Sequence, residues 1–159
     1  MAILNEIAMM RAHDHPNLVK LHEVHETEGS IYLVMDYISG QTLRSFLSKP
    51  DLPPSRSETQ NMNIISSILS CLAYFESQGS MHRDLKPDNI LMDKQGNLKI
   101  IDFGLVAFCN QDDYIFDRCG TPGYIAPEVF NYKKKSDSGN PGYDGKCDVF
   151  SAGCILFQM

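Results

Sequence analysis

The chain has 159 residues, of which 43% are apolar and 21% are charged, and its net charge is −6 at pH 7. This length and composition are typical of one globular domain and argue against disorder, collagen or a coiled coil. No run of residues approaches the ~20 consecutive apolar residues of a membrane-spanning helix, and the acidic balance argues against a general nucleic-acid binder.

The N-terminus and the cysteines indicate a compartment. The first residues contain no basic segment, and Glu6 interrupts the apolar run that a signal peptide would need. The five cysteines are odd in number and include no C-x-x-C pair, which favours free thiols in a reducing environment. We therefore expect an intracellular, cytoplasmic protein.

The N-terminal part is expected to form a helix and a hairpin. Apolar residues recur at helical spacing over residues 3–13, and Pro16 follows, which predicts a short helix. Residues 18–25 and 31–36 are apolar runs separated by a turn and predict a β-hairpin. This part also contains four histidines, His13, His15, His22 and His25. They could form a metal cluster, but no cysteine or carboxylate stands at the spacing of a known ligand set, which favours ordinary histidines.

The middle of the chain contains the clearest helix pattern. Residues 42–48 predict a short helix, and a Pro-rich connector follows it. Residues 58–78 predict a longer helix, with Ser57 as its N-cap and Gly79 just after its C-terminus. One stripe of this helix is expected to be buried and consists of Ile65, Ile68, Leu69, Leu72 and Phe75.

The C-terminal part is expected to combine short strands, long loops and one further helix. Residues 90–92 and 98–101 predict two strands joined by a turn. Residues 104–124 have no clear period and predict a long ordered loop, which in a compact domain is usually functional. Residues 133–146 predict an exposed polar insert, and residues 148–159 predict an apolar helix.

Polar residues that can carry chemistry flank the two predicted strands. Asp84 and Asn89 precede the first strand and Asp102 follows the second, so the strand pair presents all three from one end. Their oxygen atoms suit Mg²⁺, which takes few protein ligands and shares phosphate oxygens. Lys86 adds a cation where a phosphoryl group would be negative. The residues alone thus predict a magnesium–phosphate site.

Several short motifs stand in order along the chain. HRDLKPDN at residues 82–89 is similar to the catalytic loop of protein kinases, and DFG at 102–104 to their metal-binding triplet. APE at 126–128 and the Asp and Gly of DVFSAG add two further matches in the expected order. The chain therefore resembles a eukaryotic protein kinase, and Lys86 together with the segment GTPGY indicates the serine/threonine class.

The resemblance implies an α+β, protein-kinase-like bilobal fold in truncated form. It would comprise helix C, a hairpin, and a mainly helical C-lobe up to the start of its large central helix. Residues 1–159 would be one partial kinase domain, with 1–36 as the remnant of the N-lobe and 37–159 as the hinge and first part of the C-lobe. The implied reaction transfers the γ-phosphate of ATP to a Ser or Thr hydroxyl of a protein substrate, with ATP and Mg²⁺ as cofactors.

The resemblance also implies roles for particular residues. Asp84 would orient the substrate hydroxyl and accept its proton, Lys86 would touch the γ-phosphate, and Thr121 would bridge these two residues. Asn89, also catalytic, and Asp102 would hold Mg²⁺. The nucleotide would lie against Glu6, Met35, Asp36, Ile38 and Leu91. An apolar stack found in active kinases, which ordinary core packing explains equally well, would comprise Met10, Leu21, His82 and Phe103.

The resemblance also points to residues for regulation and for substrate choice. Asp117 stands where many kinases carry a phosphorylated Thr, and its carboxylate could pair with Arg83 and order the loop without phosphorylation. Tyr114 is the other residue of this loop that can be modified. Asp88 could attract a basic substrate residue, as in many related kinases, although Thr42 occupies the place where a second acidic residue would help.

Two of the kinase motifs that phosphoryl transfer requires are missing from this sequence. The chain contains no glycine-rich loop before Glu6 and no lysine to pair with that glutamate. We therefore expect the chain by itself to be inactive and to represent a fragment of a kinase. The alternative interpretation is a catalytically inactive, kinase-derived interaction module. In either case the hairpin would expose a sheet edge that could pair with another chain.

Overall fold

The structure is a computed structural model that describes residues 2–48, 58–109, 118–132 and 142–159. Its helices and small antiparallel sheets agree with the expected α+β class. In chain order the elements are α1 (Ala2–Ala12), β1 (Leu21–Thr27), β2 (Ser30–Met35), β3 (Gly40–Thr42), α2 (Leu43–Leu47), α3 (Glu58–Ser77), β4 (Ser80–Met81), η1 (Pro87–Asn89), β5 (Ile90–Asp93), β6 (Leu98–Ile100), β7 (Ala107–Phe108), α4 (Pro127–Phe130) and α5 (Lys146–Phe157).

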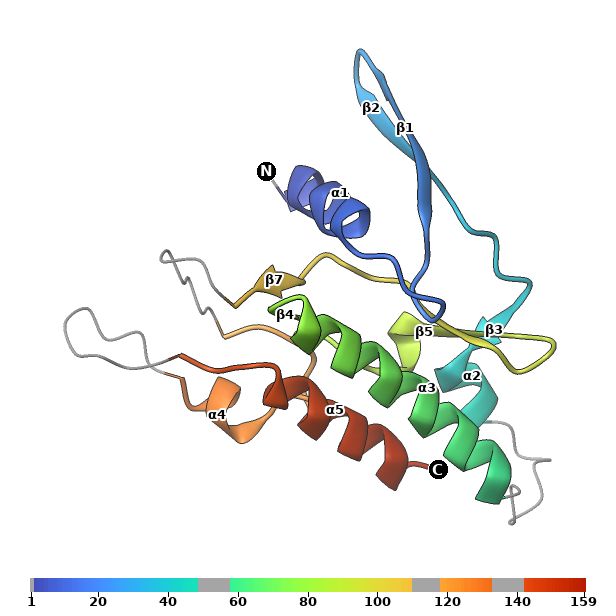
Figure 1. The fold of residues 1–159 in the computed structure, drawn as a ribbon, viewed down its shortest axis with the longest axis vertical. Helices are drawn as coiled ribbons and strands as arrows, with labels where there is room; N and C mark the ends of the chain where they lie inside the picture. The colour runs from blue at the N-terminus through green and yellow to red at the C-terminus, as the bar shows by residue number, and fades with distance from the viewer. Residues whose placement is uncertain (1, 49–57, 110–117, 133–141) are drawn as a thin grey trace.

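The predicted N-terminal helix and hairpin are both confirmed. β1 and β2 pair antiparallel around a tight turn, with Thr27 opposite Ser30. Every residue of these two strands is exposed or only half-buried, and Figure 1 shows the hairpin projecting away from the other elements. Within the described residues, no three His, Cys, Asp or Glu side chains are grouped as a metal site would require. Pairing of the hairpin with another chain stays a prediction.

The larger part of the molecule is built around α3, which lies beside α5 in Figure 1. Of the predicted stripe, Ile65, Ile68, Leu72 and Phe75 are buried, but Leu69 is 44% exposed, so its assignment to the core was wrong. Ile64 and Cys71 are buried instead, because the buried face of the helix is centred one position further round its axis. The proposed N-cap, Ser57, lies outside the described residues.

A small sheet carries the site described below. Its strand order is β3–β5–β6, all antiparallel, and β5–β6 is the pair that the sequence predicts. β3 is an addition, and it requires glycine at position 40 because a Cβ there would collide with the carbonyl oxygen of Met92. A parallel bridge between Leu18 and Ile100 ties the N-terminal part to this sheet. The ends of β5 and β6 are thereby held against the core.

The C-terminal part differs from expectation in three places. The predicted loop over 104–124 contains β7, which pairs with β4, and α4 follows it. α5 begins at Lys146, two residues earlier than predicted. Of the predicted exposed insert, residues 133–141 lie outside the described residues, but Tyr143 is only 6% exposed and packs edge-on against Tyr132. The prediction was wrong for Tyr143. This aromatic residue stands among polar residues in the sequence, but its side chain is buried in the fold.

Among the described helices, none combines the length and the apolar character that crossing a membrane requires.

Candidate active site

The segment His82–Asn89 is anchored by one buried carboxylate. Asp148, near the start of α5, accepts hydrogen bonds from the backbone N–H of His82 at 2.6 Å and of Arg83 at 2.8 Å. Burial raises the pKa of Asp148, although the neighbouring His82 and these two hydrogen bonds act in the opposite direction. Arg83 adopts a positive φ of 69°, which a non-glycine residue rarely does. The loop is therefore fixed to α5 through its backbone.

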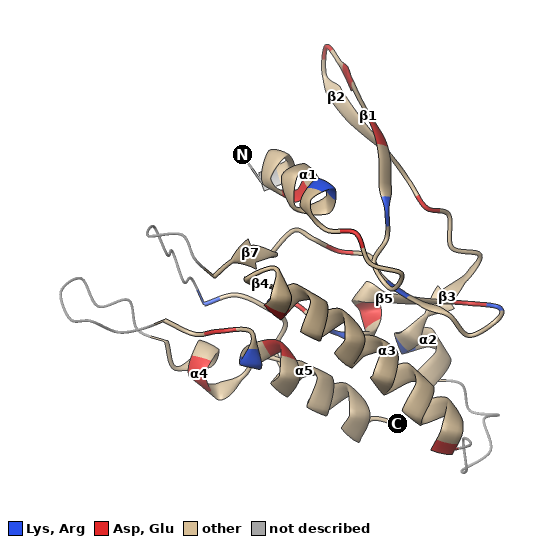
Figure 2. Cartoon of the chain, in the orientation of Figure 1, with Lys and Arg blue, Asp and Glu red and all other residues tan. Residues whose placement is uncertain are grey.

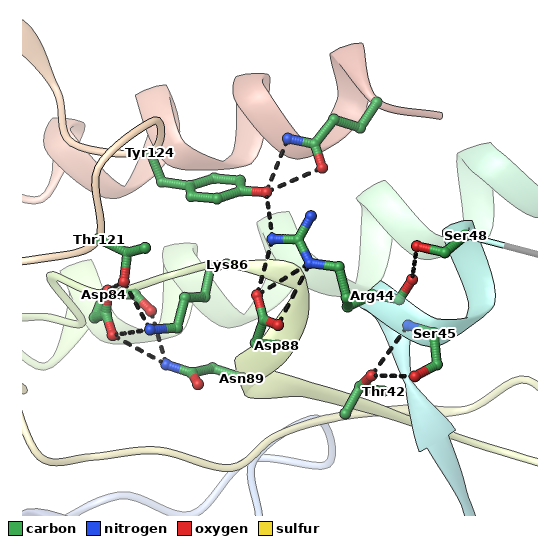
Figure 3. A network of polar contacts seen from close by, with 11 residues as sticks. Thr42, Arg44, Ser45, Ser48, Asp84, Lys86, Asp88, Asn89, Thr121 and Tyr124 are labelled. Carbon is green, nitrogen blue, oxygen red and sulfur yellow. Dashed lines mark hydrogen bonds and ion pairs between the residues drawn. The ribbon is translucent and has the colours of Figure 1, made fainter.

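Three predicted residues converge on one carboxylate, that of Asp84, as Figure 3 shows. Asp84 accepts hydrogen bonds from Lys86 Nζ at 2.8 Å and Thr121 Oγ1 at 2.6 Å. Asn89 Nδ2 donates to the backbone oxygen of Asp84 at 3.0 Å and to its carboxylate at 3.2 Å. Lys86 Nζ also donates to Thr121 Oγ1 at 2.6 Å, so Thr121 bridges Asp84 and Lys86 as expected.

This cluster is largely shielded from water. The side chain of Asp84 is 11% exposed and that of Lys86 is 19% exposed. Partial burial lowers the local dielectric, so the charges of this pair act more strongly on a bound group than they would at the surface. Three donors fix the orientation of the Asp84 carboxylate, which is the arrangement that a group acting on a bound hydroxyl needs.

The second predicted carboxylate, Asp102, follows β6. Its Oδ1 accepts a hydrogen bond from the backbone N–H of Gly104 at 2.9 Å. Burial and the charge of Asp102 both raise the pKa of Glu6, which places these two carboxylates within each other's field. His82 is fully buried, and burial lowers its pKa despite the negative charges of Asp148, Asp102 and Asp84.

Apart from Glu6 in α1, the residues expected to contact the nucleotide lie at the end of β2, in the connection from β2 to β3 (residues 36–39) and in β5. Met35 ends β2 and is exposed, Ile38 packs against the core, and Leu91 is half-buried in β5. The carboxylate of Asp36 binds Lys99 at 3.2 Å and His22 at 2.9 Å. Although burial alone would raise the pKa of Asp36, these hydrogen bonds and one from the backbone of Lys20 lower it.

Backbone groups of the same connection are partly engaged. The N–H of Asp36 donates to the carbonyl oxygen of Lys20, and the carbonyl oxygen of Ile38 accepts from the N–H of Gly40, both at 3.0 Å. Within the described ranges, the carbonyl oxygen of Asp36 and the N–H of Ile38 form no backbone hydrogen bond outside the helices and strands. These two groups are an acceptor and a donor, which is the combination that pairs with the edge of a nucleobase.

The predicted regulatory residues are described only in part. Arg83 donates through Nε to the carbonyl oxygen of Leu105 at 2.6 Å and reaches the hydroxyl of Tyr143 at 3.5 Å. Burial, followed by a hydrogen bond with Cys119, raises the pKa of Tyr143. Asp117 and Tyr114 lie outside the described residues, so the pairing of Asp117 with Arg83 stays a prediction.

A neighbouring ion pair was missed by the sequence analysis. Arg44 of α2 binds Asp88 through a forked contact, with NH2 at 2.9 Å and Nε at 3.2 Å from the same oxygen. The sequence analysis expected that Asp88 could attract a basic substrate residue, and in the structure Asp88 is already paired with Arg44. Residues 44 and 88 are far apart in the chain, so no local spacing pattern could indicate the pair. Thr42 serves as the N-cap of α2, with its side chain accepting from the backbone of Ser45.

Comparison with known proteins agrees with this geometry. The family match is to the protein kinase domain and extends over residues 1–159. The chain belongs to the protein kinase domain family. Proteins of this family use ATP and Mg²⁺. In the kinase domain described here, the expected stack of Met10, His82 and Phe103 is buried, with Leu21 packed against the same core.

Three curated relatives of this kinase domain come from plants. It is similar to CBL-interacting protein kinase 5 of Oryza sativa subsp. japonica, with 42% identity over 99% of the chain and 32% of the relative. It is also similar to CBL-interacting serine/threonine-protein kinases 15 and 18 of Arabidopsis thaliana, at 42% and 43% identity over 99% of the chain and over 35% and 29% of those proteins. The chain thus spans about a third of the length of these relatives.

Proposed function

We propose that this kinase domain transfers the γ-phosphoryl group of ATP to a Ser or Thr hydroxyl of a protein substrate. The observation that carries the proposal is the Asp84 carboxylate, held by Lys86, Asn89 and Thr121 at hydrogen-bond distance. A carboxylate fixed in this way can accept a proton from an incoming hydroxyl as general base. The serine/threonine-kinase names of the relatives support the choice of substrate.

Asp84, Lys86 and Thr121 each have a separate role in positioning the reacting groups. Asp84 orients the substrate hydroxyl and takes its proton as the oxygen attacks the phosphorus. Lys86 stands beside that oxygen and places a positive charge where negative charge accumulates on the transferring group. Thr121 keeps the carboxylate and the ammonium group in one orientation, because its hydroxyl bonds both of them.

The residues present suit a magnesium ion bound together with phosphate. Because Asn89 Nδ2 is directed toward Asp84, the Oδ1 of Asn89 is turned outward as a ligand (Figure 3). Asp102 uses Oδ1 for Gly104 and keeps its second oxygen for a cation. Two hard oxygen donors from the protein, completed by phosphate oxygens, fit the preference of Mg²⁺. When bound, the ion neutralises charge on the phosphates.

The nucleotide base would lie against β5 and the connection from β2 to β3. We assign the carbonyl oxygen of Asp36 and the N–H of Ile38 to the base edge, and Met35 and Leu91 to its faces. Glu6 of α1 lies within the field of Asp102, and in this family a glutamate at this place pairs with a lysine that contacts the phosphates.

The test is transfer of radiolabelled γ-phosphate from ATP to a degenerate Ser/Thr peptide library in the presence of Mg²⁺, by this chain joined to a kinase N-lobe segment that supplies the glycine-rich loop and its lysine. We expect Asp84→Asn to lower the rate about 10²–10⁴-fold, because the general base is lost. Asp14→Asn serves as control, because Asp14 is an exposed carboxylate whose side chain pairs with Lys20, away from Asp84. Equal rates for the wild type and Asp84→Asn would contradict the proposal. Absence of transfer by this completed protein, when it is folded, would favour the alternative of a non-catalytic interaction module.

A further inference from the structure

The Arg44–Asp88 ion pair lies at the edge of the proposed active site. Asp88 precedes Asn89 directly, so their Cα atoms are about 3.8 Å apart, and Asn89 contacts Asp84. Arg44 reaches Asp88 from α2 and also donates to the hydroxyl of Tyr124 at 2.9 Å. We call Arg44, Asp88 and Tyr124 the rim. A peptide that brings its hydroxyl to Asp84 passes the rim within a few residues.

The charge of Asp88 is neutralised within the protein. Both carboxylate oxygens face the guanidinium fork, at 2.9–3.4 Å. The hydrogen bond from Arg44 lowers the pKa of Asp88, and the hydrogen bond to Asp88 raises the pKa of Arg44, so both groups stay charged near neutral pH. Figure 2 shows basic colour on α2 and acidic colour just before β5, and Figure 3 shows the side chains of Arg44 and Asp88 directed toward each other. At the rim, positive and negative charge are therefore balanced.

A second set of contacts holds Arg44 in place. The hydroxyl of Tyr124 bonds the side-chain amide of Gln158 at 2.8 and 3.0 Å, and the Arg44 guanidinium lies 5.8 Å from the centre of the Tyr124 ring. Ser151 donates to the backbone oxygen of Tyr124 at 2.7 Å. A substrate cation could take over Asp88 only by separating Arg44 from Asp88 or by sharing the carboxylate with it.

We propose that Arg44 is a specificity-determining residue that masks Asp88, so that the rim accepts substrates with uncharged residues beside the acceptor rather than with Lys or Arg. The inference rests on the proposed function and specifies its substrate class. A substrate cation would meet an occupied carboxylate and the repulsion of Arg44. Thr42 is an uncharged cap of α2, so it supplies no second carboxylate at this place.

The expected change in peptide affinity follows from the exposure of the Arg44 and Asp88 side chains. The side chains of Arg44 and Asp88 are 42% and 47% exposed, so water screens the charges of the rim. An exposed ion pair between protein and substrate then changes binding about two- to fivefold. Removing the charge of Arg44 should therefore raise the affinity for basic peptides by this two- to fivefold factor. Damage to the fold would lower the affinity instead, so the two effects can be told apart.

The experiment measures binding rather than transfer, so it does not depend on catalysis. Short peptides carry Ala in place of the acceptor Ser, with a single Arg moved through the neighbouring positions, and a matched set carries Gln at the same positions. Affinities come from chemical-shift titration of the backbone amides of residues 86–89. For the wild type we expect Arg peptides to bind no more tightly than their Gln counterparts at any position.

Three variants sharpen the test. Arg44→Gln keeps a donor for Tyr124 but removes the charge, and we expect at least one Arg peptide to gain about two- to fivefold over its Gln counterpart. Arg44→Lys keeps the charge and should keep the wild-type ratio. Arg44→Gln combined with Asp88→Asn should lose the gain.

The proposal is overturned if the wild type already prefers Arg peptides, if folded Arg44→Gln shows no gain, or if the gain survives Asp88→Asn. A gain in Arg44→Lys equal to that in Arg44→Gln would also overturn it. Failure of phosphate transfer with the expected binding shifts would instead count against the proposed function.

Discussion

The loop formed by residues 82–89 and the β1–β2 hairpin are held by different kinds of contact. Four residues of the loop, His82, Leu85, Pro87 and Asn89, are buried, and its backbone is bonded to Asp148 from a distant helix. The hairpin contains only exposed or half-buried residues and depends on cross-strand pairing. Isolated two-stranded hairpins are marginally stable in water.

This difference bears on how the proposed site is assembled. The groups proposed for proton and phosphate chemistry are fixed by long-range polar contacts within the larger part of the molecule. Met35, proposed to contact the base, ends a strand that contributes no buried residue. The two regions are joined at Asp36, which binds Lys99 of β6 and His22 of β1. The substitutions below test whether stability is distributed in this way.

The largest effect is expected at Asp148. Asp148→Ala would leave the buried N–H groups of His82 and Arg83 without their acceptor, at a cost of about 1–3 kcal/mol each in the free energy of unfolding. Asp148→Asn keeps one acceptor oxygen and should lose less. Chemical denaturation gives both values. A loss within about 0.5 kcal/mol for Asp148→Ala, as for a neutral surface substitution, would show that the loop is not anchored through this residue.

A smaller effect is expected at Thr121. Thr121→Val removes the hydroxyl that donates to Asp84 and accepts from Lys86, and hydrogen bonds to charged groups contribute about 1.5–3 kcal/mol. Thr121→Ser keeps the hydroxyl and should retain most of that stability. Denaturation measures the loss, and the transfer assay should show a lower kcat for Thr121→Val than for Thr121→Ser. Equal behaviour of the two variants would mean that the bridge contributes nothing.

Substitutions in the hairpin should cost less still. Tyr32 lies opposite His25 on β1 and is largely exposed. Tyr32→Ala should lower the free energy of unfolding by about 0.2–1 kcal/mol, the range of one cross-strand pair. The midpoint of denaturation measures this. A cost as large as that of Asp148→Ala would contradict the contrast between the two regions.

The smallest effect concerns pH. Burial and the charge of Asp102 raise the pKa of Glu6, so the folded state binds this proton more tightly than the unfolded state does. The resulting stabilisation is present below the unfolded pKa of about 4.3 and is lost as the pH rises through the folded value. Glu6→Gln should therefore raise the melting temperature slightly at pH 7, with the difference vanishing below about pH 4.

The control for this prediction is Asp102→Asn. Removing the like charge should reduce the pH-dependent difference that Glu6→Gln makes without abolishing it, because burial is the larger cause. If the wild type and the Glu6→Gln variant differed by an amount that does not vary with pH, the titration of Glu6 would not be linked to folding.

Local patterns were sufficient for most of the secondary structure and for the core of the site. The hairpin, α3 and the β5–β6 pair follow from periodicity and turn residues, which act over a few positions. Asp84, Lys86 and Asn89 lie within one short segment, so their order alone indicates that they converge. Thr121 was placed by resemblance, and its bond to Asp84 agrees with that placement.

Contacts between distant segments were the part that local patterns missed. Arg44 and Asp88 each look like an ordinary surface charge, and only the packing of α2 against η1 brings them together. Tyr143 lies among polar residues, yet the chain folds it against Tyr132. Leu69 fits a helical stripe, but the partners of α3 decide which side of that stripe is covered. In each case the missing information was which distant segment packs against the residue. The spacing of residues within one segment does not specify such a contact.

The most direct test of this account is amide hydrogen exchange measured residue by residue on the wild-type protein. We predict that the amides of His82 and Arg83 exchange only through large-scale unfolding, because each donates to the carboxylate of Asp148, a residue that is 2% exposed. The paired amides of β1 and β2 should exchange faster, through local opening of the hairpin. Hairpin amides as protected as those of His82 and Arg83 would contradict the claim that long-range contacts to Asp148, and not the hairpin, hold the proposed active site.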